Sequence, residues 1–170
     1  KDLDAAEEIF SKIGKNTQNP EILNFLGLFD LENMKFIDAI KNFSKAANLD
    51  KSNSKYYYNL ANAYFYNGWH EEAQKAYTKA LYLNPDNLDY RYSLAYLYFD
   101  EKNYIKSKKE AEAILNIDAN HPQTRVLKAL LAAEDKDLLG AKEILEENIA
   151  KGFCDDFTKI SLSRIYTELN

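Results

Sequence analysis

The sequence predicts an all-α protein built from antiparallel helix pairs, and three observations carry that prediction. First, one set of large, small and aromatic residues recurs along the chain at a fixed interval of about 34 residues. Second, the three prolines and five glycines stand mostly at the boundaries between the segments that the pattern defines, where helices begin and end. Third, the segments at both ends carry apolar residues spaced three and four apart, which is one face of a helix.

The clearest copy of the pattern lies in the middle of the chain and consists of Tyr57, Leu60, Ala61, Tyr64, Ala73, Tyr77, Ala80 and Pro85. The preceding copy contains Leu23, Leu26, Gly27, Ala39, Phe43 and Ala46, and the following copy contains Arg91, Leu94, Ala95, Tyr98, Ser107, Ala111 and Ile114. A fourth copy matches weakly in its first half, where Arg125, Lys128, Ala129 and Ala132 stand.

This period and this order of residues resemble the tetratricopeptide repeat (TPR), a helix–turn–helix unit, over nearly the whole chain. The resemblance implies a right-handed α-solenoid in which antiparallel helix pairs stack into a TPR-like superhelix. We expect a single array, with the second helix of a partial repeat at 1–19, full repeats at 20–53, 54–87, 88–121 and 122–155, and a first-helix half repeat or cap at 156–170. A chain that starts and stops inside a repeat is expected to be a fragment of a longer array.

The small residues of the pattern explain how the helices approach one another. Gly27, Ala61, Ala95 and Ala129 are expected to let a neighbouring helix come close, and Ala39, Ala73, Ser107 and Ala141 do the same from the second helices. Large side chains such as Phe43 and Tyr77 then fill the space beside them, as in any close-packed interior.

Composition excludes several classes of protein. A net charge of -5 and a pI near 5.2 disfavour binding to nucleic acid, whose phosphates select basic surfaces. No apolar run approaches the roughly 20 residues that cross a bilayer, so we expect no membrane insertion. Cys154 is the sole cysteine and favours a reducing compartment such as the cytoplasm, although the sequence leaves the localisation open.

The residues that usually carry catalysis are scarce. His70 and His121 fall in predicted turns and are expected to be solvated, and Cys154 is expected to be a small buried residue. Cys-x-x-Cys pairs, paired histidines and glycine-rich phosphate loops are missing from the sequence, which removes the usual metal and nucleotide motifs. We therefore predict no enzyme activity, no cofactor and no metal.

The residues that point to a function are aromatic. In TPR proteins the first helices line a concave face, and the positions of this chain that match it are Tyr58, Asn59, Asn62, Phe65, Tyr66, Tyr92, Tyr96 and Phe99. Twelve of the thirteen tyrosines lie between Tyr56 and Tyr104, more than the helix–helix core is expected to absorb. Tyrosine is favoured at interfaces, and the amides of Asn59 and Asn62 are expected to bond to a peptide backbone.

Two other interpretations of the aromatic residues and of the groove remain open. The rings of Tyr58, Phe65, Tyr92 and Phe99 also suit the seam between adjacent first helices, and another copy of the chain also suits the groove.

Two specialised functions of related proteins are excluded because this chain lacks the residues that they require. A co-chaperone clamp for acidic tails needs basic residues where Asn24 and Asp89 stand, and the nucleic-acid readers among related arrays use a longer period and basic inner faces.

We therefore expect a non-catalytic adaptor that binds a peptide or helix of a partner protein in a concave aromatic groove. The alternative is a structural self-assembly segment that forms homo-oligomers through its open repeat ends or its groove.

Overall fold

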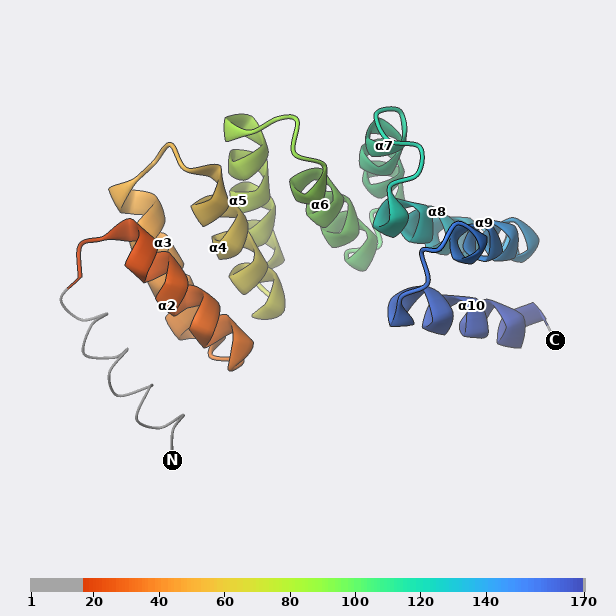
Figure 1. The fold of residues 1–170 in the computed structure, drawn as a ribbon, viewed down its shortest axis with the longest axis horizontal. Helices are drawn as coiled ribbons and strands as arrows, with labels where there is room; N and C mark the ends of the chain where they lie inside the picture. Colours follow the sequence, from red (N-terminus) through yellow and green to blue (C-terminus); the bar gives the residue numbers. More distant parts are fainter. Residues whose placement is uncertain (1–16, 170) are drawn as a thin grey trace. The chain divides into compact units, whose positions relative to one another are not determined.

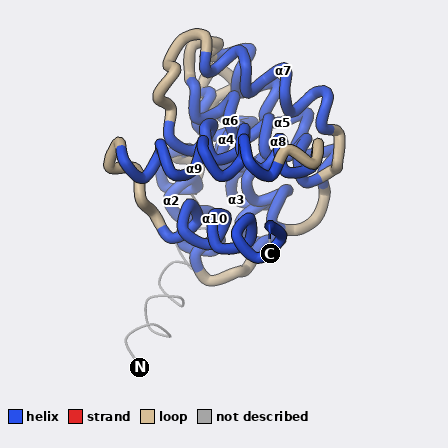
Figure 2. Tube along the Cα trace, turned by 90° about the vertical axis from the view of Figure 1, so that its right-hand side faces the viewer, coloured by secondary structure: helices blue, strands red, loops and turns tan. Residues whose placement is uncertain are grey.

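The computed structural model describes residues 17–169, and this part of the chain forms nine helices and no strand (Figures 1 and 2). The helices are α2 (Pro20–Glu32), α3 (Phe36–Leu49), α4 (Ser54–Tyr66), α5 (His70–Leu83), α6 (Leu88–Asp100), α7 (Tyr104–Leu115), α8 (Pro122–Glu134), α9 (Leu138–Ala150) and α10 (Asp156–Leu169). Alternate helices start at positions 20, 54, 88, 122 and 156, which is the interval of the sequence pattern. The all-α class predicted from the sequence is confirmed. The helix predicted from Leu3, Ala6, Phe10 and Ile13 lies outside the described residues.

The chain divides into two compact units, Lys1–Tyr90 (unit 1) and Arg91–Asn170 (unit 2). In unit 1, α2 packs beside α3 and α4 packs beside α5, as Figure 1 shows. In unit 2, α8 packs on α9, and α10 contacts both of them. The boundary between the units falls inside α6.

Helix starts are fixed by side-chain caps. The Asn19 Oδ1 atom accepts hydrogen bonds from the backbone N–H groups of Glu21 at 2.8 Å and Ile22 at 3.3 Å, and Pro20 follows at the first helical position. Asn53 caps α4 in the same way. These bonds satisfy N–H groups that have no partner inside the helix, so Asn19 and Asn53 set where α2 and α4 begin.

The turn between the two helices of a pair contains a residue in the left-handed backbone conformation. Met34, Gly68, Lys102 and Lys136 have φ angles of 57°, 78°, 60° and 70° and occupy the same position of four successive repeats. A left-handed conformation reverses the chain after a helix, and glycine adopts it without a steric penalty. Three of the four turns therefore hold a strained side-chain-bearing residue where the best-matching repeat has glycine.

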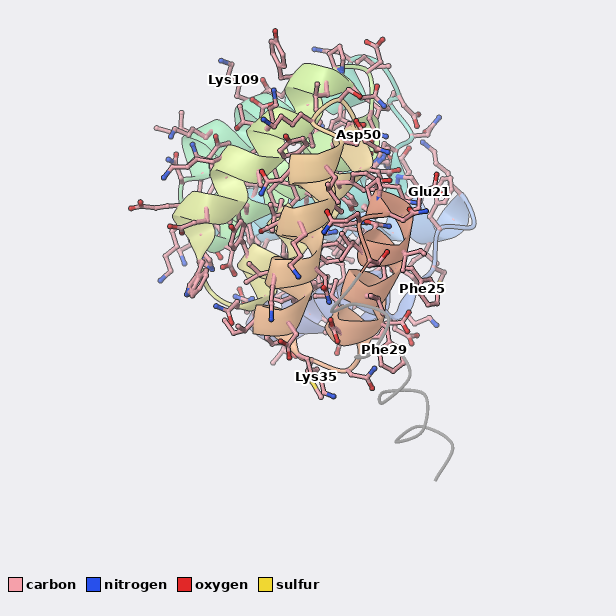
Figure 3. The ribbon with its side chains drawn as sticks, turned by 90° about the vertical axis from the view of Figure 1, so that its left-hand side faces the viewer. Glu21, Phe25, Phe29, Lys35, Asp50 and Lys109 are labelled. Atoms are coloured by element: carbon pink, nitrogen blue, oxygen red, sulfur yellow. The ribbon has the colours of Figure 1, made fainter. Side chains whose placement is uncertain are left out.

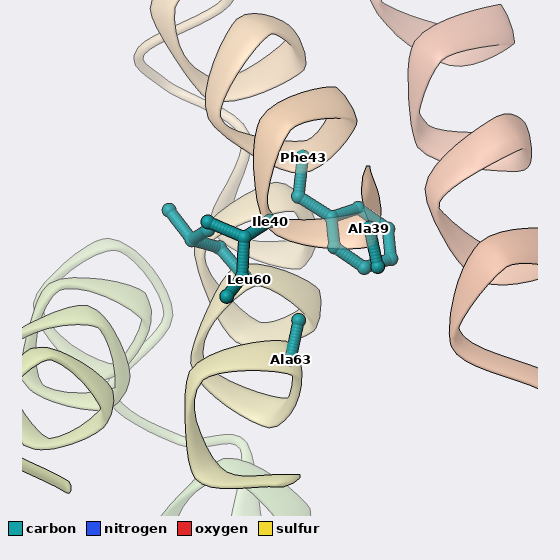
Figure 4. Packing of buried hydrophobic residues seen from close by; sticks show 5 residues of the cluster. All are labelled: Ala39, Ile40, Phe43, Leu60 and Ala63. Atoms are coloured by element: carbon teal, nitrogen blue, oxygen red, sulfur yellow. The ribbon is translucent and has the colours of Figure 1, made fainter. Parts of the chain in front are cut away.

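The core of unit 1 is closed by large side chains. Figure 4 shows one buried cluster, formed by Ala39, Ile40, Phe43, Leu60 and Ala63 from α3 and α4. Phe43 is fully buried, and a Cβ atom added to Gly27 would lie 2.6 Å from its ring. Glycine at position 27 is therefore required by the close approach of α2 to the Phe43 ring.

Two buried clusters lie in the described part of unit 2. Ala95, Ala111, Leu127 and Leu131 form the first, and Val126, Ala129, Ala141, Leu145 and Ile165 form the second. Ser107, the predicted substitute for a small apolar residue, is fully buried, and its hydroxyl donates to the Ala95 carbonyl at 2.8 Å. Burial of the hydroxyl costs little because this bond satisfies it.

Candidate functional site

The eight predicted groove residues belong to two helices. Tyr58, Asn59, Asn62, Phe65 and Tyr66 lie on α4 in unit 1, and Tyr92, Tyr96 and Phe99 lie on the part of α6 in unit 2. Each set is described within its own unit.

In unit 1, Tyr58 is held in a small stack of phenol rings. Its centroid lies 4.5 Å from that of Tyr90, with 22° between the planes, and 6.0 Å from that of Tyr77. The Tyr77 hydroxyl donates to the Asn62 Oδ1 atom at 2.6 Å. Tyr58 and Asn62 are both half-buried, so they serve the packing of α4 as well as lining its surface.

Asn59 differs from the expectation of an open amide. Its side chain is 5% exposed, and its Nδ2 atom donates to the Asn24 Oδ1 atom of α2 at 2.7 Å. Both residues are buried, so the bond satisfies polar atoms that water does not reach. Asn59 therefore joins α2 to α4, and its amide donor is used inside unit 1.

The C-terminal end of α4 presents a second aromatic group. Phe65 stacks on the ring of His70 at 5.7 Å and meets Tyr66 edge to face at 5.6 Å. Tyr66 also stacks on Phe36 at 6.1 Å and keeps 61% of its surface exposed. Tyr66 is the most accessible of the predicted groove residues in unit 1.

The first helix of unit 1 adds aromatic surface. Figure 3 shows Glu21, Phe25 and Phe29 along one side of α2, pointing away from α3. Phe25 is 56% exposed. It lies one repeat before Asn59 at the same position of the pattern, so the corresponding place on α2 carries an exposed ring instead of a buried amide.

In unit 2, the three predicted residues form a continuous row of rings. Tyr92 lies 6.1 Å from Tyr96, and Tyr96 lies 6.2 Å from Phe99. All three are half-buried and pack on the cluster of Ala95, Ala111, Leu127 and Leu131. The row stands on an apolar floor that fixes its orientation while one side of the rings remains accessible.

Other elements extend this row. His121 lies 6.1 Å from Tyr92, and Tyr104 lies 5.6 Å from Phe99. Phe157, at the start of α10, meets Tyr96 edge to face at 6.4 Å. We call the six residues Tyr92, Tyr96, Phe99, Tyr104, His121 and Phe157 the aromatic row.

A hydrogen bond anchors one end of the aromatic row. The Tyr104 hydroxyl donates to the Glu134 Oε2 atom at 2.9 Å. This bond stabilises the protonated phenol beside a carboxylate, which raises the pKa of Tyr104. The ring therefore stays neutral and oriented across the ordinary pH range.

Sequence reasoning missed Phe157, Tyr104 and Tyr90. Phe157 occupies the second position of the terminal half repeat, which is one of the positions that face the groove in TPR proteins. The rule that selected the other residues would have found it if it had been applied to that half repeat. Tyr104 and Tyr90 carried no separate signal, because their roles depend on ring contacts between helices.

Three expectations for single residues were wrong. His121 is 7% exposed rather than solvated, and its Nδ1 atom lies 2.8 Å from the Thr124 hydroxyl at the start of α8. The ring is buried because it caps this helix and packs against Tyr92. Cys154 is exposed rather than buried, because it lies in the loop between α9 and α10. His70, expected to be solvated, is half-buried against Phe65.

Within residues 17–169, no group of three or more His, Cys, Asp or Glu side chains is arranged to hold a metal ion. Among the described helices, none combines the length and the apolar character needed to cross a bilayer.

Comparisons with known proteins agree with this architecture. Tetratricopeptide repeat models match residues 54–87 and residues 88–121. No curated protein matches the sequence with significance.

Similar solved structures share the fold. A tetratricopeptide repeat protein from Parabacteroides merdae is 22% identical over 99% of this chain and 67% of its own, with a TM-score of 0.84. MamA is 23% identical over 89% of both chains, with a TM-score of 0.76. YrrB, described as a TPR protein with an unusual peptide-binding site, is 18% identical over 94% of this chain and 82% of its own, with a TM-score of 0.67.

At these identities the likeness concerns the fold, whereas the two repeat models match the sequence itself. The repeat models assign residues 54–121 to the tetratricopeptide repeat family, and the helix pairs that recur at the same interval between residues 20 and 169 have the same architecture.

Proposed function

We propose that this chain binds a peptide or helix of a partner protein through the aromatic face of its first helices, without catalysing a reaction. The tetratricopeptide repeats at residues 54–121 support a protein-interaction module in the general sense. The aromatic row of unit 2 is the observation that carries the more specific proposal. Its rings are oriented by an apolar floor and by one another, and such preorganised rings bind at a low entropic cost.

The chemistry of the surface indicates what kind of segment it binds. Phenol rings combine a large apolar area with a polar edge, which suits apolar side chains attached to a polar backbone. Asp89 and Asp100 lie at the two ends of α6 and are exposed, so an acidic segment is disfavoured. The segment that we propose is neutral or basic and carries apolar side chains. YrrB, with its peptide-binding site, is a precedent for peptide binding by this fold.

The test uses a peptide selected against the whole chain from a displayed random library, with affinity measured by calorimetry. Tyr96→Ala is expected to weaken binding at least about tenfold, because Tyr96 touches three other rings of the row and central aromatic residues dominate interfaces. Tyr82→Ala is the matched control, since Tyr82 is 78% exposed on the second helix α5. Thermal melts of both variants report on their folding.

Equal affinities of the two variants would contradict the proposal. A loss of affinity accompanied by an equal loss of helicity in Tyr96→Ala would assign the row to the core instead.

Self-assembly is a second candidate function, and a cleft on α10 favours it. Leu162, Ser163 and Tyr166 line this cleft of about 370 Å³, together with Ile149 of α9. They stand three repeats after Leu60, Ala61 and Tyr64 of α4, a helix that packs on both the preceding helix α3 and the following helix α5. We propose that the predicted second helix at 2–14 of another copy covers this surface.

Sedimentation velocity over a concentration series tests the second candidate. Self-association is expected to appear at high concentration in the unaltered chain and to weaken in Leu162→Asp. A strict monomer at millimolar concentration would remove this candidate and leave the first untouched.

A further inference from the structure

Unit 2 contains a cleft of about 350 Å³ between α7 and α8. Its apolar wall is formed by Ala111 and Leu115 of α7 and by Leu131 and Ala132 of α8. None of the predicted groove residues lines it, although Ala111 and Leu131 of its wall also belong to the floor on which the aromatic row packs.

The corresponding place in unit 1 is filled. The cleft residues stand two repeats after those of the closed cluster in Figure 4. Phe43 corresponds to Ala111, Leu60 to Lys128 and Tyr64 to Ala132. Phe43 and Leu60 are buried in unit 1, and Tyr64 packs against them. Unit 2 therefore lacks three large apolar side chains of this junction, while Leu115 and Leu131 stand where unit 1 has Ala47 and Ala63.

The missing side chains describe what fits the cleft. An aromatic ring of the size of Phe43 or Tyr64 is the group that this position of the fold encloses in unit 1. Wall residues Ala111 and Leu131 are buried and apolar, so an apolar body is favoured inside.

Charged residues surround the opening. Lys108 forms an ion pair with Asp135 across the two elements, and Glu112 and Lys128 also line the cleft. Ammonium groups beside a ring favour an aromatic occupant over an aliphatic one. A phenol hydroxyl can reach the charged rim and keep a hydrogen bond, as the hydroxyls of Tyr104 and Tyr166 do with Glu134 and Glu146 in this unit.

From these observations we propose that the α7–α8 cleft is a binding pocket for one aromatic side chain, a tyrosine, presented by a partner polypeptide. The partner supplies the ring that unit 1 supplies from its own sequence. A contact here adds a second anchor point to the chain and depends on Ala111, Lys128 and Ala132 having remained small or polar.

The probes are p-cresol, which is the tyrosine side chain without its backbone, and N-acetyl-tyrosinamide, which carries the backbone as well. Titration of the whole chain is followed by ¹H–¹⁵N NMR. Both probes are expected to shift the amide resonances around Leu115 and Ala132, which line the cleft and do not belong to the floor of the aromatic row. The expected dissociation constants are on the order of 1 mM for so small a ligand. The resonances around Phe43 are expected to stay in place, because the equivalent space is filled there.

A filled variant provides the decisive comparison. Lys128→Leu with Ala132→Tyr introduces the residues of unit 1, and it is expected to raise the melting temperature by about 2–4 °C and to abolish the shifts caused by p-cresol. Lys109→Leu is the matched control: it makes the same change of charge and hydrophobicity on α7, at an exposed residue outside the cleft. Lys109→Leu is expected to bind p-cresol as the unaltered chain does.

Each further outcome decides the proposal. Unmoved cleft resonances at 10 mM p-cresol, a concentration about tenfold above the expected constant, would overturn it, as would binding that persists in the filled variant. If p-cresol binds and N-acetyl-tyrosinamide does not, the occupant would be a small molecule, and the proposal of a partner polypeptide would be overturned. Equal affinity for 4-methylcyclohexanol would overturn the preference for an aromatic ring. Since the groove residues are unchanged in every variant, failure here leaves the proposed function standing.

Discussion

The α3–α4 junction of unit 1 and the α7–α8 junction of unit 2 occupy the same positions of the repeating pattern, yet one is closed and the other is open. Phe43, Leu60 and Ala63 fill the first junction. At the second, Ala111 and Leu131 are buried beside a cleft, and Lys128 lies at its opening. Helices form in both cases, so the large residues of the pattern are dispensable for the helices themselves.

The small residues show the opposite behaviour. Ala61 of unit 1 and Ala129 of unit 2 are both fully buried, and each stands where a neighbouring helix makes a close approach. A large side chain can be lost and leave a cavity, whereas a small one cannot grow without moving a helix. The comparison teaches that the small residues at the positions of Ala61 and Ala129 are kept, whereas other core positions differ in size between the units. The buried Ala63 of unit 1, for example, corresponds to the buried Leu131 of unit 2.

The largest effect is expected when the closed junction is opened. Phe43→Ala removes a fully buried ring, and we expect the free energy of unfolding to fall by about 3–5 kcal/mol. Leu115→Ala at the open junction is expected to cost less, because Leu115 is half-buried and lines an existing cleft. Urea unfolding followed by circular dichroism measures both. Equal losses would erase the contrast between the two junctions.

Gly27→Ala tests the close approach in unit 1. The added Cβ would lie 2.6 Å from the Phe43 ring, so overpacking is expected to cost about 1–3 kcal/mol, although alanine is the better helix former. The same change in a Phe43→Leu background is expected to cost less, because the narrower side chain leaves room. A Gly27→Ala variant that is more stable than the unaltered chain would show that the ring moves aside freely.

Much of the fold could be predicted from the sequence because the residues of the repeating pattern have direct effects on packing and on helix ends. Small residues at Ala61 and Ala95 and helix starts near Pro20 and Pro122 follow from packing and capping chemistry. The weak fourth copy, with Lys128 and Ala132 in place of large residues, already signalled a difference in unit 2. Its consequence, an open cleft, needed the positions of α7 and α8.

The candidate surface was less predictable. Periodicity places Asn59 and Tyr66 on the same helix but does not say that one is buried against Asn24 and the other exposed. His121 was misjudged because a turn residue that caps a helix can be buried by the rings beside it. Contacts between side chains that are distant in the sequence decide these cases, and a repeat period carries no information about them.

The turns offer a smaller contrast between the units. Gly68 in unit 1 and Lys136 in unit 2 both have positive φ, and nothing lies within 4 Å of a Cβ placed on Gly68. Steric strain of the backbone alone then decides the effect. Lys136→Gly is expected to stabilise the chain by about 1 kcal/mol, and Gly68→Ala to destabilise it by about as much.

Lys142→Gly is the matched control for the turn variants, since Lys142 lies inside α9. There the same substitution is expected to cost about 1 kcal/mol, as glycine does in a helix interior. Thermal melts of the three variants compare the signs directly. Destabilisation by Lys136→Gly as well would mean that the lysine side chain contributes more than its strained backbone costs.

The smallest effect concerns a network of charged and polar side chains in unit 2, at a place where unit 1 has the Lys79 ammonium group over the ring of Tyr57. Arg125 and Asn148 stand where Tyr57 and Ala80 stand two repeats earlier. The Arg125 Nε atom donates to Asn148 at 2.9 Å, while Glu147 pairs with Lys151 at 2.7 Å and with Arg125 at 2.5 Å. Hydrogen bonds from Lys151 and Arg125 lower the pKa of Glu147 from 4.5 to about 2.

Because the pKa of Glu147 is lower in the folded chain than in the unfolded chain, its carboxylate stabilises the fold above pH 4.5. That contribution is lost as the pH falls from about 4.5 towards 2. Glu147→Gln is therefore expected to be slightly less stable than the unaltered chain at pH 7 and equally stable near pH 2. Salt at 1 M, where the Debye length is about 3 Å, is expected to narrow the difference at pH 7. A difference in stability that is the same at both pH values would show that Glu147 acts through packing and not through its charge.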